Sequence, residues 1–217
     1  MSDATARVPW VVGMTGASGT PYARSVVNGL LDAGRPVDLI VSRAARLTLI
    51  DETGLGLRDS HWREDVTTWL GRNFGDDAIR YWTASDFSAG PSSGSYATAG
   101  MIVVPASAAA VAGIALGLSK DLLQRAGSVM LKERRRLIVV PREAPYTGEL
   151  LRQMLALHEE GAVIIPASPG FYAGSDSVQR LVDFLAAKVL DIAGVPHDLI
   201  TRWTGQLGAA RTPATVE

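Results

Sequence analysis

The sequence predicts a doubly wound α/β domain in which a mostly parallel sheet lies between two layers of helices. Short runs rich in valine and isoleucine alternate with helical stretches along most of the 217 residues. These runs show little alternation with polar residues, which is typical of strands buried on both faces. Strands that alternate with helices favour parallel pairing through right-handed crossovers. We expect one domain, with a core at about residues 8–195 and a C-terminal extension at about 196–217.

Each element follows from a local pattern. The apolar runs predict strands, in chain order, at 8–14, 36–42, 79–83, 100–105, 136–141 and 162–166. The stretches around them predict helices at 20–33, 43–52, 62–73, 107–117, 119–132, 147–160 and 176–193. The longest apolar stretch, 99–118, divides at Pro105 into a strand and a helix, so we expect no membrane span. Polar stretches at 84–98 and 167–177 interrupt the alternation, as functional loops often do.

The composition excludes several kinds of site. The absence of cysteine excludes disulfides, thiolate metal sites and cysteine nucleophiles, and it is compatible with a cytoplasmic protein. The three histidines are scattered, so we expect no metal site. A net charge of −1 gives no electrostatic basis for binding nucleic acid or an anionic membrane. The N-terminus has no signal-peptide pattern.

Small residues fill the turn between the first strand and the first helix. The string "GMTGASGTPYAR" contains Gly13, Gly16 and Gly19, a G-x-x-G-x-x-G spacing that differs from the dinucleotide fingerprint G-x-G-x-x-G. Such a turn lets the backbone approach an anion, and the start of the following helix favours phosphate. The hydroxyls of Thr15 and Ser18 would add donors. A tight turn in which Ser18 merely caps the helix explains the pattern equally well.

Polar residues follow two other strands at the edge where such folds bind ligands. Ser42 either caps the helix that begins at 43 or contacts the same ligand. Glu52 ends that helix, where a carboxylate opposes the helix dipole, which favours a role other than stability. Arg142 and Glu143 follow the strand at 136–141, and this adjacent pair of opposite charges favours function.

A basic helix adds candidates for binding an anionic substrate. Arg125 and Lys132 are seven residues apart on one helix face, although basic residues near a helix end are often only solvated. Tyr172 follows the last strand in "PASPGFYAGS". The string "GPSSG" at 90–94 matches the nucleophile elbow G-x-S-x-G, but no apolar strand precedes it, which excludes a serine hydrolase of that type.

Taken as a set, the motifs resemble the flavin prenyltransferase family (UbiX-type). The strings that carry the resemblance are "GMTGASGTPYA", "SRAARLTLIDET", "SGSYATAGMIVVPAS", "LLQRAGSVMLKERRRLIVVPREAPY", "GAVIIPASPGFY" and "VDFLAAKVLD", and they extend from about residue 8 to 204. The resemblance implies a Rossmann-like or flavodoxin-like subunit, assembled as a homododecamer. It also implies that dimethylallyl phosphate donates a C5 unit to N5 and C6 of reduced FMN. The prenylated FMN then serves UbiD-type decarboxylases.

The resemblance also assigns roles to individual residues. The FMN-binding positions are Gly16, Ala17, Ser18, Ser42, Ser107 and Arg142. The positions around the prenyl phosphate are Glu52, Arg125, Lys132, Glu143, Tyr172 and Lys188. Catalysis is expected from Ser18, Glu52 and Glu143. The proton lost on ring closure would go to Glu143, to Ser18 or to the released phosphate. No step requires a metal.

Two positions depart from the family's pattern. Lys188 stands where arginine is common, which keeps the charge but loses the bidentate fork. Ala108, Ala109 and Ala110 follow Ser107 where relatives carry threonine or another polar residue, so backbone N–H groups would have to hold the flavin there.

Other functions remain as alternatives. A flavin-dependent cysteine decarboxylase of the same fold would use a catalytic histidine, for which the sequence offers no good candidate. A non-catalytic carrier of FMN or prenylated FMN would explain the two departures. A dinucleotide dehydrogenase is disfavoured by the first turn and by the lack of an acidic residue at the end of the second strand.

Overall fold

A six-stranded parallel sheet between two layers of helices forms the centre of the molecule, as the sequence predicts. The computed structural model describes residues 8–171 and 177–203. The strands are β1 (Trp10–Met14), β2 (Val37–Val41), β3 (Ile79–Thr83), β4 (Gly100–Ala106), β5 (Leu137–Pro141) and β6 (Val163–Ile164). They pair in the order β3-β2-β1-β4-β5-β6, and every pair is parallel.

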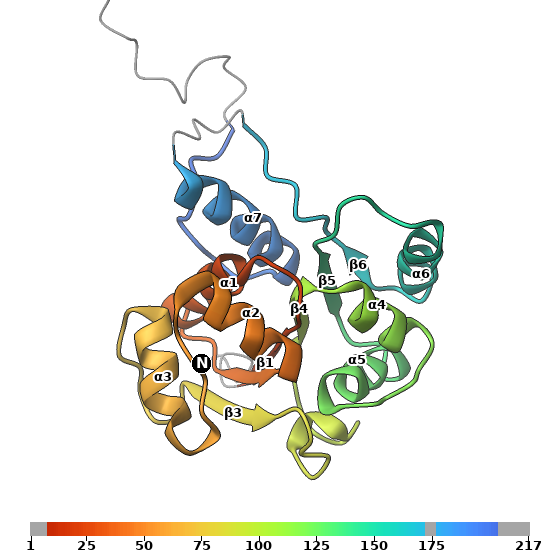
Figure 1. Cartoon of the computed structure of the whole chain (residues 1–217), viewed down its shortest axis with the longest axis horizontal. Coiled ribbons are helices and arrows are strands. Elements are labelled where there is room, and N and C mark those ends of the chain that lie inside the picture. Colours follow the sequence, from red (N-terminus) through yellow and green to blue (C-terminus); the bar gives the residue numbers. More distant parts are fainter. Residues whose placement is uncertain (1–7, 172–176, 204–217) are drawn as a thin grey trace, which may run out of the picture.

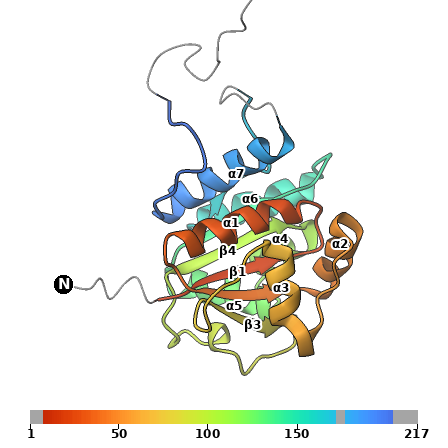
Figure 2. The same cartoon turned by 90° about the vertical axis from the view of Figure 1, so that its left-hand side faces the viewer.

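Helices cover both faces of this sheet (Figure 1). They are α1 (Thr20–Asp32), α2 (Arg43–Thr53), α3 (Trp62–Leu70), α4 (Ala108–Ala115), α5 (Leu122–Lys132), α6 (Gly148–Glu159) and α7 (Val178–Ala193). Short 3-10 turns lie at Asp59–His61 and Gly90–Ser92. Figure 2 shows α1 and α7 above the sheet and α5 below it. None of the described helices is long and apolar enough to cross a membrane.

Alternate strand residues build two separate cores. Val12, Leu39 and Ile102 face one side, where they pack with α1, α3 and α7. Val11, Ile40 and Met101 face the other, where they pack with α4, α5 and α6. The strands read as nearly continuous apolar runs because both of their faces are covered.

Local signals explain where the helices differ from their predicted bounds. The predicted helix 119–132 begins only at Leu122, because the Asp121 carboxylate caps it by accepting from Gln124 N at 2.8 Å. The predicted helix 62–73 ends at Leu70, because Gly71 adopts a left-handed conformation with φ 71°. The last strand is shorter than predicted and contains only Val163–Ile164.

The polar stretch 84–98 is held against the sheet by a buried carboxylate. Asp38, in the middle of β2, is fully buried. It accepts hydrogen bonds from Arg80 Nε at 2.9 Å, Trp82 Nε1 at 3.1 Å and Tyr96 Oη at 2.9 Å. Arg135 at the end of α5 donates to the carbonyl oxygens of Gly94 and Tyr96 from the other side. These hydrogen bonds therefore hold the stretch 84–98 in place beside α5.

Candidate active site

The candidate site lies at the carboxyl ends of the strands, where β1 and β4 meet. The chain leaves β1 for β2 on one side, and it later returns to β4 on the other side. Doubly wound folds bind ligands in the crevice at this point of reversal. Residues 15–19 form the turn after β1 at this position. Gly16 and Ser18 are exposed there, whereas Ala17 between them is buried.

Thr15 joins the ends of the two central strands instead of facing a ligand. Its hydroxyl donates to Pro105 O at 2.7 Å, and it accepts from Ser107 N at 2.7 Å. The side chain is only 2% exposed. The hydroxyl of Thr15 therefore already donates within the protein, and it fixes the turn after β1 to the start of α4.

Three helices, α2, α4 and α5, begin at the same small cavity. The cavity has a volume of about 200 Å³, and its lining residues are Thr15, Gly16, Ser42, Arg43, Ala44, Ser107, Ala109, Ala110, Asp121, Leu123 and Gln124. Ser42 caps α2 by accepting from Ala45 N at 3.1 Å, and Ser107 caps α4 by accepting from Ala110 N at 3.3 Å. Of the two alternatives for Ser42, the structure shows the helix cap, and Ser42 also lines the cavity.

This cavity fits the phosphate of FMN. The first N–H groups of a helix have no partner within that helix, and they carry the positive end of its dipole. Here α2 and α4 both present such groups beside two serines. A Cβ at Gly16 would stand 2.5 Å from Ala44 Cβ, so glycine is what allows the turn to approach α2. Of the three alanines after Ser107, Ala110 already donates its N–H to Ser107, so Ala108 and Ala109 are the ones that can supply backbone donors.

Glu52 reaches across from the end of α2 to the start of α1. Its Oε1 accepts from Gly19 N at 2.8 Å, and its Oε2 accepts from Thr20 N at 2.8 Å and from Thr20 Oγ1 at 2.6 Å. Burial alone would raise the pKa of this carboxyl, but hydrogen bonds from Ser18, Thr20 and Gly19 lower it below its usual range. The carboxylate that opposes the dipole of its own helix thus caps another helix.

Arg142 links the end of β5 to the same turn. Its Nε donates to Ser18 O at 3.1 Å, and the rest of its half-buried guanidinium remains able to bind an anion. The neighbouring Glu143 is exposed, and its Oε1 accepts from Ala144 N at 3.1 Å. The pair predicted from "PREAP" therefore lies beside Ser18, with opposite charges available at one edge.

The predicted phosphate-binding cations lie apart within one chain. Arg125 is on α5 and donates from Nε to Ser92 O at 3.0 Å. Lys132 ends α5 and pairs with Glu133. At 1.5 Å of rise per residue, it lies about 12 Å along the helix from Gln124 at the cavity. Lys188 is exposed on α7, in the other helix layer, with its Nζ 6.0 Å from the ring centroid of Phe184. Tyr172 lies outside the described residues.

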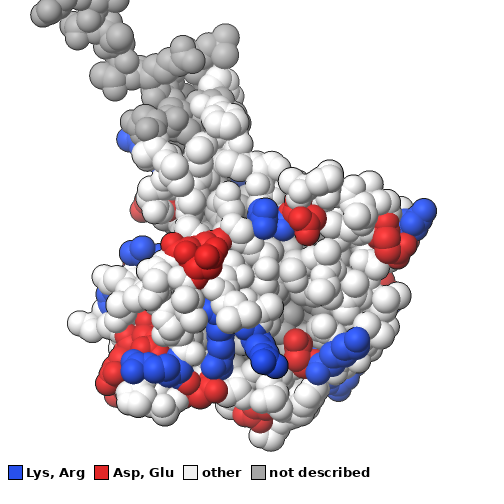
Figure 3. Space-filling view, viewed as in Figure 1, with Lys and Arg blue, Asp and Glu red and all other residues white. Residues whose placement is uncertain are grey.

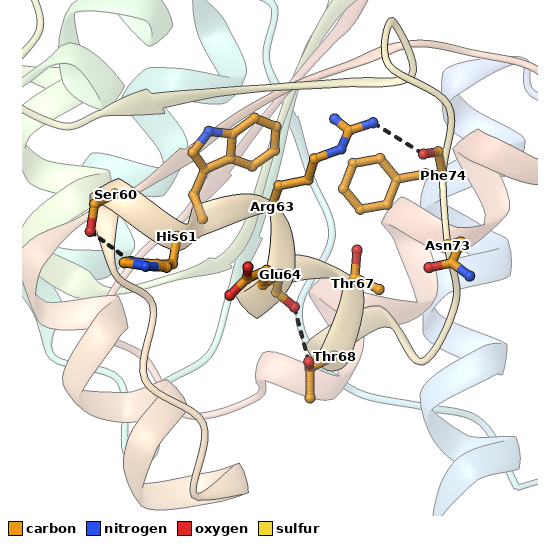
Figure 4. A pocket seen from close by; sticks show the side chains of 9 residues that line it. Ser60, His61, Arg63, Glu64, Thr67, Thr68, Asn73 and Phe74 are labelled. Atoms are coloured by element: carbon orange, nitrogen blue, oxygen red, sulfur yellow. Dashed lines mark hydrogen bonds between the residues drawn. The ribbon is translucent and has the colours of Figure 1, made fainter.

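A larger hollow on the surface of α3 is a weaker candidate. It has a volume of about 550 Å³ and contains none of the predicted site residues. Figure 4 shows Arg63 directed across it toward Phe74, whose carbonyl oxygen it contacts at 3.2 Å. The same guanidinium pairs with Asp76 at 2.7 Å. The Arg63 guanidinium therefore already has partners within the protein. The residues that the structure describes contain no group of histidines and carboxylates that could hold a metal.

Sequence reasoning missed Thr20 as part of the site. Its hydroxyl is fully buried against Glu52, which is 32 positions away in the chain. The short pattern around Gly19 and Thr20 gives no signal of this contact, because it depends on how α2 packs beside α1.

Known proteins are similar to this chain in both sequence and fold. A family model described as Flavoprotein matches residues 2–190. The flavin prenyltransferase UbiX of Streptomyces coelicolor is 59% identical over 213 residues, which cover 94% of this chain and 99% of that protein.

Two solved structures superpose over most of the chain. The AnUbiX (PadA1) crystal structure in complex with FMN and dimethylallyl pyrophosphate has a TM-score of 0.81 at 34% identity, covering 92% of this chain and 99% of that one. A dodecameric FMN-dependent UbiX-like decarboxylase from Escherichia coli O157:H7 has a TM-score of 0.80 at 35% identity, covering 91% and 100%. With its turn, helix starts and Glu52 in the arrangement described above, the chain belongs to the UbiX-type flavin prenyltransferases of the Flavoprotein family.

Proposed function

We propose that this chain transfers a dimethylallyl group from dimethylallyl phosphate to N5 and C6 of reduced FMN, giving prenylated FMN for a UbiD-type decarboxylase. The observation that carries this proposal is the cavity at the β1–β4 switch point, where Gly16, Ser42 and Ser107 meet beside the exposed Ser18. The 59% identity to a flavin prenyltransferase supports the reaction. A related chain crystallised with FMN and dimethylallyl pyrophosphate supports both substrates. We also assign the protein to the cytoplasm, which the absence of cysteine accommodates.

The residues at the cavity bind and orient the acceptor. The starts of α2 and α4, with Ser42 and Ser107, bind the FMN phosphate. Reduced FMN, when bound, supplies the electron-rich N5 and C6 atoms that form the new bonds to carbon. We assign Ser18 to the reacting edge, because it is exposed in the turn beside the cavity and its hydroxyl oxygen has lone pairs for an N–H of the ligand.

Charged residues handle the phosphate and the proton. Cleavage of the allylic C–O bond leaves its electron pair on the phosphate oxygen, so cations that face this oxygen lower the barrier. We assign Arg125, Lys132 and Lys188 to this role, with Tyr172 beside them. Ring closure at C6 releases a proton, and we assign the exposed carboxylate of Glu143 as its acceptor.

These cations can meet on one phosphate only if more than one copy of the chain contributes. Lys188 lies in the layer of α1, α3 and α7, whereas Arg125 and Lys132 lie on α5 in the opposite layer. The sheet therefore separates them within one chain. We propose that the chain forms a homo-oligomer, a dodecamer as in the Escherichia coli relative, in which neighbouring copies complete each site.

The proposed reaction is tested by mass. Protein, reduced FMN and dimethylallyl phosphate are incubated without oxygen, and the molecular mass of the extracted flavin is measured. A parallel sample contains dimethylallyl diphosphate in place of dimethylallyl phosphate. A gain of one C5H8 unit is expected. Glu143→Gln should bind FMN equally well and form product about a hundredfold more slowly, within the range for a lost general base. Bound FMN of unchanged mass in the native protein would instead identify a flavin carrier.

Mixed assemblies test whether copies share a site. The variants Lys132→Met and Lys188→Met are prepared singly, where each should be nearly inactive, and then co-expressed with different affinity tags. Mixed oligomers should regain part of the activity, because some sites then receive both native lysines from different chains. Co-expression of the wild type with Lys132→Met provides the reference activity with which the mixed oligomers are compared. If mixed oligomers stay as inactive as either parent, each site is built within one chain.

A further inference from the structure

The start of α1 has an unusual cap. Gly19 occupies the capping position, has φ 120° and offers no side chain to the free N–H groups. Glu52 from α2 accepts from those groups instead, at 2.8 Å for both Gly19 N and Thr20 N. These two contacts alone would satisfy the helix start. The Thr20 hydroxyl adds a third contact, at 2.6 Å to Glu52 Oε2, which the cap does not require.

The extra contact limits what else Glu52 can accept. A carboxylate offers about four acceptor sites. Gly19 N, Thr20 N and Thr20 Oγ1 take three of them, which leaves one acceptor site for a further donor, and Ser18 directly precedes Gly19 in the turn. Thr20 is fully buried, so its hydroxyl has little freedom to turn to solvent. Ser18 is exposed toward the ligand side of the same turn.

From this geometry we propose that Thr20 is a positioning residue for prenyl transfer: its hydroxyl holds the Glu52 carboxylate in one orientation, so that the remaining acceptor site of Glu52 can take the Ser18 hydroxyl and the Ser18 oxygen can accept from the N–H of a reduced flavin. The inference rests on the proposed function. It concerns Thr20, whose side chain does not touch the ligand cavity, and it explains why a buried hydroxyl is added to a complete cap.

Other charged groups surround the pair. Arg142 approaches from the end of β5 through Ser18 O, and Glu143 follows it. Asp51 precedes Glu52 on α2, and Tyr22 lies on α1 near Arg142, which counteracts the rise in its pKa that burial causes. Substitution of Thr20 leaves all four groups in place. A change in the titration of Glu52 can therefore be assigned to the lost hydroxyl.

The test compares Thr20→Val, which keeps the shape and removes the hydroxyl, with Thr20→Ser, which keeps the hydroxyl. In the full-length protein without flavin, carbon NMR of the glutamate carboxyls gives the pKa of Glu52, and Glu52→Gln assigns its signal. We expect Thr20→Val to raise this pKa and Thr20→Ser to retain it. Prenyl-transfer kcat at neutral pH should fall about tenfold in Thr20→Val, the scale of one hydrogen bond to a charged group. The acid limb of its pH profile should move upward.

Two further measurements separate positioning from folding. FMN affinity and the thermal midpoint should change little in Thr20→Ser. If both variants lose stability and activity alike, or if Thr20→Val leaves the pKa of Glu52 and the pH profile unchanged, the proposal is overturned. If the native protein does not prenylate FMN, the proposed function fails. The Glu52 titration then still decides whether Thr20 controls that carboxyl.

Discussion

Glu52 is unfavourable for its own helix, and its position is explained by its contact with another helix. In the sequence it opposes the dipole of α2, whereas in the structure it caps α1. Gly16, Ser42, Ser107 and Arg142 could be predicted as site residues, because each directly follows a strand whose end is visible in the sequence. The roles of Thr15 and Thr20 could not, since their partners are distant in the chain and depend on packing.

Glu52→Gln should lower stability in a pH-dependent way. The pKa of Glu52 lies below its ordinary value of 4.5, so its contribution to stability is present above that value. The contribution is lost as pH falls through the lowered pKa of the folded state. The thermal midpoint of Glu52→Gln should therefore be lower than that of the native protein near pH 7, and the gap should close in acid. Asp51→Asn, an exposed change on the same helix, is the control. A gap that stays constant down to the acid range would contradict the capping role.

Lys188→Arg tests the position where the resemblance to the family predicts arginine. An arginine can bind phosphate through two parallel hydrogen bonds, whereas lysine acts as a point charge. We expect the KM for dimethylallyl phosphate to fall about threefold to tenfold in Lys188→Arg with little change in kcat, because the net contribution of one added hydrogen bond is about 0.5–1.5 kcal/mol. Lys188→Met should leave little activity at any accessible concentration of dimethylallyl phosphate, as a greatly raised KM would produce. Steady-state kinetics at saturating FMN measure the KM of both variants. Equal KM values in the native protein, Lys188→Arg and Lys188→Met would remove Lys188 from the phosphate site.

At the scale of elements, apolar runs determined the strands, and polar stretches marked the loops. All six strands and seven helices expected from the sequence occur among the described residues. What the sequence did not show is how the stretch 84–98 is held. Asp38 interrupts an apolar strand in "VDLIV", and its partner Tyr96 is 58 positions away. A charge in a buried strand was the available signal, because such a group requires buried partners.

Tyr96→Phe should loosen this stretch and reveal the tyrosine's titration. Burial and the nearby Asp38 raise the pKa of Tyr96 to about 12. A raised pKa favours the neutral form, so the contact stabilises the fold below the ordinary tyrosine value of 10 and is lost as pH rises toward 12. Removal of the hydroxyl leaves Asp38 without one of its hydrogen-bond donors. The free energy of unfolding, measured with denaturant at neutral pH, should therefore fall by about 1–3 kcal/mol.

A titration of tyrosinate absorbance provides the check. The native curve minus the Tyr96→Phe curve should show one group that ionises near pH 12. Tyr146→Phe, which removes an exposed tyrosine, is the control. If the difference curve for Tyr96 has its midpoint near 10, the buried contact with Asp38 is absent in solution.

At the scale of the whole molecule, the separation of cations between two layers makes assembly a requirement of the proposed chemistry. The surface offers apolar area for this purpose. Leu151 and Leu155 lie four residues apart on α6, and they are 50% and 56% exposed. Leu116 and Leu118 are exposed at the end of the neighbouring α4. In Figure 3, basic and acidic side chains are interspersed, and broad uncharged areas separate them.

Placing a charge at the centre of this apolar surface should therefore disrupt assembly and catalysis together. Leu151→Glu and Leu155→Glu put carboxylates where a contact between copies would bury them, and an unpaired buried charge is strongly unfavourable. Light scattering should show a smaller particle, and FMN prenylation should fall with the fraction of assembled protein. Thr68→Glu adds the same charge to the exposed face of α3 and should leave both unchanged. A smaller particle that keeps full activity would mean that one chain completes its own site, since the opposite layers would then have no need of a neighbour.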